Sequence, residues 1–122
     1  MGGFLVKLLK SLAFIGILTP NVGFSDCDIK VSTHVEPMFL SQIQCLRIAS
    51  DVLWAKKFKN KSDHSEISAW GGKGKYKAVI RCVAEERVAF FVVAGLKGKL
   101  TRQYVDELGI LFNSEANQNM EH

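Results

Sequence analysis

Residues 69–95 read Ala-Trp-Gly-Gly-Lys-Gly-Lys-Tyr-Lys-Ala-Val-Ile-Arg-Cys-Val-Ala-Glu-Glu-Arg-Val-Ala-Phe-Phe-Val-Val-Ala-Gly, and most of the β-prone apolar residues after the N-terminal leader lie here. Turn residues divide the segment, which predicts strands over 66–70, 75–83 and 88–94. In the second strand, Tyr76, Ala78, Ile80 and Cys82 alternate with Lys75, Lys77, Val79, Arg81 and Val83. This alternation is typical of an antiparallel strand with one face inward. Residues 88–94 are apolar on both faces, which indicates the most buried strand of the sheet.

Helical periodicity flanks this segment on both sides. Over 38–58, Met38, Cys45, Ala49, Val52 and Leu53 form one apolar stripe, and Pro37 suits the first helical turn. Over 99–112, Leu100, Tyr104, Leu108 and Leu111 form a second stripe, and the polar residues 114–122 predict a disordered tail. We therefore expect an α+β domain over 37–113, with a helix, a three-stranded antiparallel β-meander and a closing helix in two layers.

The first 25 residues have the layout of a secretory signal peptide. Lys7 and Lys10 precede the apolar run Ser11–Leu18, and Gly23 and Ser25 are the small residues that a signal peptidase requires. The run is shorter than the roughly 20 residues of a transmembrane helix, although an uncleaved anchor is the alternative. Cleavage after Ser25 would leave about 97 of the 122 residues and lower the formal net charge from +4 to about +2. We expect a periplasmic or secreted protein whose signal peptide is its only membrane contact.

Residues 26–36 alternate between apolar and polar positions. Ile29, Val31, Thr33 and Val35 recur with a period of two. This pattern predicts an N-terminal arm or an edge strand.

The three cysteines lie beyond the predicted cleavage site, where disulfides can form. Cys45 belongs to the apolar stripe of the first helix and Cys82 to the inward face of the second strand, so we expect the two to be bonded. The bridge would close a loop of about 37 residues and stabilise the fold by roughly 3–4 kcal/mol. Two separate buried thiols are the alternative, and the absence of a Cys-x-x-Cys motif argues against a catalytic pair. Cys27 would remain free or bridge a second chain.

No motif indicates a cofactor, a metal or catalysis. The glycines of 71–74 join two strands and lack P-loop spacing, and the loop 95–101 lacks it too, although it precedes a helix and could take an anion. His34 and His64 show no metal-ligand spacing. We expect no catalytic residue, no cofactor and no metal site.

Lysines 56, 57, 59, 61, 73, 75 and 77 fall in one third of the chain, with Trp70 and Tyr76 among them. Either they form an ordinary solvated face or they bind an anionic partner. An exported protein seldom meets nucleic acid, so the expected partner is an anionic envelope polymer. The candidate binding residues are Trp70, Lys73, Lys75, Tyr76 and Arg81.

The outward face of the sheet carries Val79 and Val83, beside either Phe90 and Val92 or Phe91 and Val93. An exposed apolar patch of this kind marks a protein partner or a homodimer interface. The alternative is that the N-terminal arm, with Ile29, Val31 and Val35, covers the patch.

The string Trp70–Cys82, with Phe90–Gly95 after it, resembles the Trp-Gly-x-x-Gly-x-Tyr-x-Ala-x-Ile-Arg-Cys core and Phe-x-Val-Ala-Gly ending of a group of small exported bacterial proteins without assigned function. Cys45 is similar to a cysteine on their preceding helix, and Val93 is an extra residue in the ending. The resemblance covers residues from about Met38 to Phe112. It implies export and one domain, and no activity, substrate or cofactor. We expect a non-catalytic binding or interaction module, the alternative being an envelope enzyme or accessory factor acting on an anionic substrate.

Overall fold

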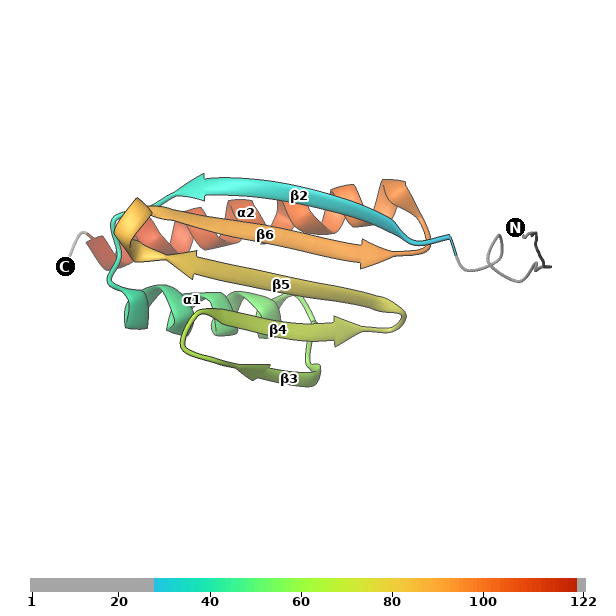
Figure 1. Ribbon diagram of the computed structural model, residues 1–122, viewed down its shortest axis with the longest axis horizontal. Coiled ribbons are helices and arrows are strands. Elements are labelled where there is room, and N and C mark those ends of the chain that lie inside the picture. Colours follow the sequence, from blue (N-terminus) through green and yellow to red (C-terminus); the bar gives the residue numbers. More distant parts are fainter. Residues whose placement is uncertain (1–27, 121–122) are drawn as a thin grey trace, which may run out of the picture.

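The alternating segment around Ile80 is the central strand of a five-stranded antiparallel sheet (Figure 1). The computed structural model describes residues 28–120. Its elements are β2 (Lys30–Pro37), α1 (Gln42–Ala55), β3 (Asn60–His64), β4 (Ser68–Lys73), β5 (Tyr76–Val83), the short 3₁₀ turn η2 (Ala84–Glu86), β6 (Val88–Gly95) and α2 (Gly98–Met120). The strand order is β2-β6-β5-β4-β3, and both helices lie behind the same face of the sheet. The predicted signal peptide and Cys27 lie outside the described residues.

The α+β class is confirmed, but the predicted three-stranded meander is wrong because a further strand lies at each edge. At one edge, β2 pairs with β6 along its whole length, so residues 30–37 are an edge strand. At the other edge, β3 pairs with β4 through Asp63 and Trp70. The sequence of β3 is entirely polar and largely exposed, so it shows no apolar period. Its pairing rests on backbone hydrogen bonds, which the side-chain pattern does not report.

Two further features of the sheet differ from the prediction, the end of β4 and the burial of β6. Strand β4 continues through Gly71 and Gly72, and the turn consists of Gly74, with a φ of +60°, and Lys75. A Cβ at Gly71 would overlap the carbonyl oxygen of Phe58, so this glycine allows two backbones to approach closely. Strand β6, expected to be the most buried strand because it is apolar on both faces, lies next to the edge of the sheet, and only one of its faces is buried.

The two helices also have boundaries that differ from the prediction. Helix α1 starts at a capping box in which Ser41 Oγ accepts from Gln44 N–H and Gln44 Oε1 accepts from Ser41 N–H. Pro37 therefore ends β2 instead of starting the helix. Helix α2 continues to Met120, because Ala116 packs in the core and Asn119 donates to the carbonyl of Glu115. The predicted disordered tail is therefore helical from residue 114 to Met120.

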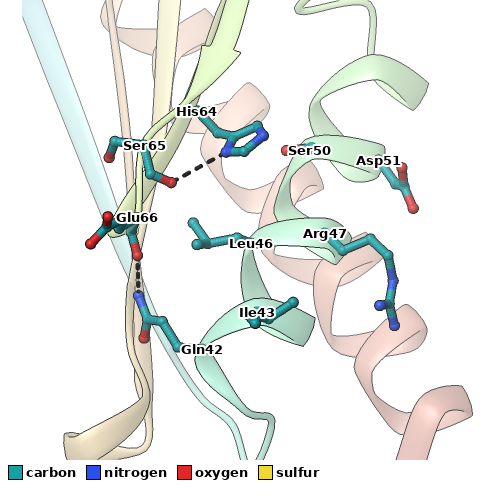
Figure 2. A pocket seen from close by; sticks show the side chains of 9 residues that line it. All are labelled: Gln42, Ile43, Leu46, Arg47, Ser50, Asp51, His64, Ser65 and Glu66. Atoms are coloured by element: carbon teal, nitrogen blue, oxygen red, sulfur yellow. Dashed lines mark hydrogen bonds between the residues drawn. The ribbon is translucent and has the colours of Figure 1, made fainter.

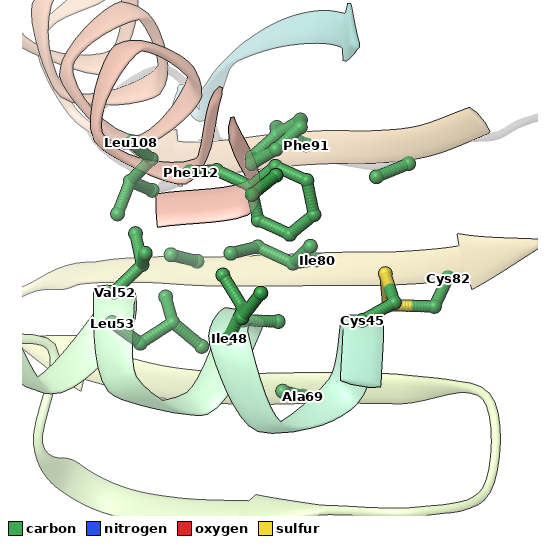
Figure 3. Close-up of a cluster of buried hydrophobic side chains, with 14 of the residues drawn as sticks. Cys45, Ile48, Val52, Leu53, Ala69, Ile80, Cys82, Phe91, Leu108 and Phe112 are labelled. Carbon is green, nitrogen blue, oxygen red and sulfur yellow. A yellow bond between two sulfur atoms is a disulfide. The ribbon is translucent and has the colours of Figure 1, made fainter. Parts of the chain in front are cut away.

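The core lies between the helices and the sheet (Figure 3). The inward positions Ala78, Ile80 and Cys82 of β5 are buried as predicted. Phe91 of β6 meets Phe112 of α2 edge to face, with ring centroids 5.3 Å apart. The predicted disulfide between Cys45 and Cys82 is present and links α1 to β5. The two helices therefore cover one face of the sheet, and the opposite face carries no helix.

Neither helix of residues 28–120 is long and apolar enough to cross a lipid bilayer. The disulfide is compatible with a location outside the reducing cytoplasm.

Candidate interaction surface

The side of the sheet that carries no helix, which we call the open face, is built from alternate residues of four strands. The pairing register aligns them in rows across the sheet. The middle row is Thr33, Val92, Val79 and Trp70; one neighbouring row is Val35, Phe90, Arg81 and Ser68, and the other is Val31, Ala94, Lys77 and Gly72. The open face therefore uses Phe90 and Val92, while Phe91 and Val93 belong to the core.

Large apolar side chains of this face are exposed to solvent. The exposed fractions are 59% for Val31, 51% for Val35, 41% for Phe90, 37% for Val79 and 36% for Trp70. The solvated side of an antiparallel sheet ordinarily carries polar residues. A contiguous apolar patch on a protein surface marks an interaction site.

Strand β2 enlarges the patch because its polar residues other than Thr33 face the helices. Ser32 is buried, and its hydroxyl lies 2.8 Å from that of Thr101 in α2. His34 Nε2 lies 2.6 Å from Glu36 Oε2, and its ring stands edge-on to Phe91. Val31 and Val35 consequently point to the open side. The alternative that the N-terminal arm covers the patch is wrong for residues 30–37, because they extend the sheet instead.

On these four strands, two side chains of the open face are charged. Both are cationic, and both lie on β5. Lys77 and Arg81 flank Val79 along this strand. Neither belongs to an ion pair among the described residues. The half of the open face formed by β2 and β6 carries no charged side chain, so it is the part best suited to being buried against a protein.

The five predicted binding residues do not converge on one site. Trp70 and Arg81 belong to the open face, and Lys75 is exposed in the β4–β5 turn. Lys73 lies on the helical side, with Nζ 4.3 Å from the ring centroid of Tyr104. The Tyr76 ring packs against Tyr104, and its hydroxyl accepts from Lys97 N–H at 3.2 Å. Lys73 and Tyr76 therefore hold the N-terminal part of α2 against the sheet.

A groove that the sequence did not predict lies between α1 and the β3–β4 connection (Figure 2). Its volume is about 830 Å³, and it is lined by Gln42, Ile43, Leu46, Arg47, Ser50, Asp51, His64, Ser65 and Glu66. The feature of the sequence that could have indicated the groove is Ile43, an apolar residue on the otherwise polar side of α1. The groove arises because the edge strand β3, which the pattern missed, brings His64 opposite this helix.

The polar groups of the groove form no catalytic arrangement. The Gln42 amide donates to the carbonyls of Glu66 and Cys82 and accepts from Ala84 N–H, so its hydrogen-bonding capacity serves to hold α1 on the sheet. His64 Nδ1 lies 3.2 Å from its neighbour's carbonyl oxygen. Across residues 28–120 no three His, Cys, Asp or Glu side chains gather into a set that could hold a metal ion.

Comparison of the chain with models of protein families, with curated proteins and with solved structures found no match. The resemblance of Trp70–Cys82 to small exported bacterial proteins therefore stays a prediction.

Proposed function

We propose that this protein is a non-catalytic interaction module of the periplasm or the extracellular space, and that two copies associate through their open faces. The observation that carries the proposal is the apolar open face opposite a sheet side that two helices already cover. Packing two such faces would remove Val31, Val35, Val79 and Phe90 from water. The result would be two sheets packed face to face with the helices outside.

The size of the open face suits a reversible dimer. Strands of eight residues are about 26 Å long and four of them are about 19 Å wide, so the face covers roughly 500 Å². Two copies would then bury on the order of 1,000 Å², which is the lower limit for a specific protein interface. We therefore expect association in the micromolar range.

The charges of β5 set the position of the contact. Lys77 and Arg81 have no acidic partner on the strands β2, β6, β5 and β4, and burying them unpaired would be costly. A contact centred on the middle row, from Thr33 to Trp70, lets the long side chains of Lys77 and Arg81 in the neighbouring rows extend to the rim, where the charged groups reach water.

Sedimentation velocity over a range of concentrations tests the proposal. The exported protein is used with Cys27→Ser throughout, so that no disulfide between chains forms. We expect a monomer–dimer equilibrium that Phe90→Lys abolishes. Ile110→Lys is the matched control, because Ile110 is 72% exposed on α2, away from the open face. A monomer at every concentration would contradict self-association, and equal dimerisation by both variants would place the contact elsewhere.

An accessory role toward an anionic envelope component is the second candidate function. It is supported by the lysines, which lie at one end of the molecule and, apart from Lys77, outside the open face.

A further inference from the structure

Every lysine of residues 28–120 lies at one end of the molecule, which we call the lysine end. Its members are Lys30, Lys56, Lys57, Lys59, Lys61, Lys73, Lys75, Lys77, Lys97 and Lys99. The sequence had grouped only part of this set. The fold adds Lys30, Lys97 and Lys99 from segments far away in the chain.

The strand register and the element boundaries bring these residues together. Lys30 pairs with Gly95 and Lys77 with Ala94, so the start of β2, the end of β6 and the start of β5 lie side by side. Asn60, at the start of β3, pairs with Gly72 of β4, beside the turn that carries Lys75. Figure 1 shows that α1 ends and α2 begins at this same end.

Acidic residues gather at the opposite end of the molecule. Glu36, Glu66, Glu85, Glu86 and Glu115 lie there, together with Arg47 and Arg87. At the lysine end, Asp28 pairs with Lys30 at 2.8 Å, and the other acidic residues of the described chain, Asp51, Asp63, Asp106 and Glu107, lie along the elements between the two ends. The molecule therefore has a strong asymmetry of charge that its small net charge conceals.

Structural roles account for only some of the lysines. Lys56 and Lys57 follow the C-terminus of α1, where positive charge offsets the helix dipole. Lys59 lies over the Trp54 ring and Lys73 over the Tyr104 ring. Among the described residues, Lys61, Lys75, Lys77, Lys97 and Lys99 form no ion pair, and all are exposed. Concentrating like charges in this way is unfavourable unless an anion offsets it.

The arrangement fits a broad anionic surface better than a small anion. No lysine lines the groove of Figure 2, and none lines two smaller grooves, one between Trp54 and Trp70 and one beside Arg81. Lysine is a point charge without the bidentate geometry by which arginine recognises individual phosphates. The disulfide is compatible with a compartment where nucleic acid is scarce, which favours a lipid surface over a nucleic acid.

We propose that the lysine end docks the protein on an anionic phospholipid membrane, oriented with its strands and helices pointing away from the bilayer. Each lysine near such a surface contributes attraction that falls off within a Debye length. The binding is electrostatic, reversible and sensitive to salt. Apart from Lys77, which belongs to both surfaces, this contact uses other residues than the open face, and it stands whether or not two copies associate.

Co-sedimentation of the full chain with vesicles tests the proposal. One set of vesicles contains equal parts of phosphatidylglycerol and phosphatidylcholine, and the other contains phosphatidylcholine alone. The test variant is Lys75→Glu with Lys97→Glu. The control is Arg47→Glu with Arg87→Glu, which changes the net charge equally but at the opposite end. Thermal unfolding first establishes that both variants are folded.

The proposal predicts binding to the anionic vesicles only, weakened at least about tenfold by the test variant and less than about twofold by the control. Raising the salt concentration should release the wild-type protein. Equal binding to both vesicle types by every variant would assign the vesicle binding to the apolar run Ser11–Leu18 and overturn the proposal. Binding to soluble polyphosphate without binding to anionic vesicles would overturn it as well, as would the absence of binding at low salt.

Discussion

Cys45 of α1 and Cys82 of β5 are joined by a disulfide, with their Cα atoms 6.0 Å apart. Gln42, one helical turn before Cys45, donates to the carbonyl oxygen of Cys82 at 2.8 Å. A covalent and a polar contact therefore hold the first turn of α1 on the end of the central strand. This end of α1 also forms one wall of the groove in Figure 2.

Removing the disulfide should lower the stability of the fold substantially. Its half-cystines are 37 residues apart in the chain, and a loop of this length corresponds to about 3–4 kcal/mol in the chain-entropy model. We expect Cys45→Ala with Cys82→Ala to reduce the free energy of unfolding by this amount, measured by urea denaturation without reductant. Cys27→Ser is the control and should have little effect. An unchanged urea midpoint in the double variant would show that the bridge adds nothing.

The thiol content of the protein follows from the same bond. Since Cys45 and Cys82 are paired, Cys27 is the remaining cysteine of the chain. Intact mass after alkylation in denaturant should show one label for each chain, and three labels only after reduction. Three labels without reduction would mean that the disulfide does not form.

Gly71 and Gly72 should respond differently to the same substitution. A Cβ at Gly71 would overlap the carbonyl oxygen of Phe58, whereas one at Gly72 would lie 3.3 Å from the carbonyl oxygen of Asn60. A backbone atom cannot move aside as a side chain can. We expect Gly71→Ala to cost about 2–4 kcal/mol of stability and Gly72→Ala less than about 1 kcal/mol. Similar melting temperatures for the two variants would contradict the close approach of β4 and Phe58.

The buried hydroxyls of Ser32 and Thr101 should be coupled energetically. Thr101 is fully buried and donates to the carbonyl oxygen of Gly98, so its oxygen accepts from Ser32. Thr101→Val should cost about 1–3 kcal/mol because Ser32 loses its partner inside the core. In a double-mutant cycle, Ser32→Ala should lower the free energy of unfolding by about 1 kcal/mol less in the Thr101→Val background than in the wild-type protein. Additive effects would mean that the two hydroxyls do not interact.

Side-chain periodicity was sufficient to predict much of the interior of this fold. The inward alternation of β5, the apolar stripe of the first helix and the pairing of Cys45 with Cys82 all follow from which residues must avoid water. The stripe predicted for the second helix was displaced: its residues Leu100, Tyr104 and Leu111 are half-buried, and the buried face of α2 is formed by Thr101, Val105, Leu108, Phe112 and Ala116. The disulfide could be predicted because both cysteines lie on faces that the core brings together.

The edges of the fold could be predicted only in part, because the edge strand of residues 30–37 was one of two expected alternatives and β3 was missed. Strand β3 has no apolar residue to bury, and the alternation of β2 is inverted, with valines toward solvent and Ser32 toward α2. Trp70 and Arg81 share the open face, whereas Lys73 and Tyr76 lie on the helical side, as the alternation of the second strand predicted for Tyr76. The lysine end depends on contacts between distant segments, and only the strand register reveals them.

The fluorescence of Trp70 tests the role of the open face most directly. Trp70 is 36% exposed on that face, and Trp54→Phe removes the other tryptophan of the chain. As the protein concentration rises, we predict that Trp70 emission shifts to the blue and acrylamide quenching falls. The same protein carrying Phe90→Lys should show neither change. If Trp70 stays equally accessible to acrylamide across the whole concentration range, association through the open face is contradicted.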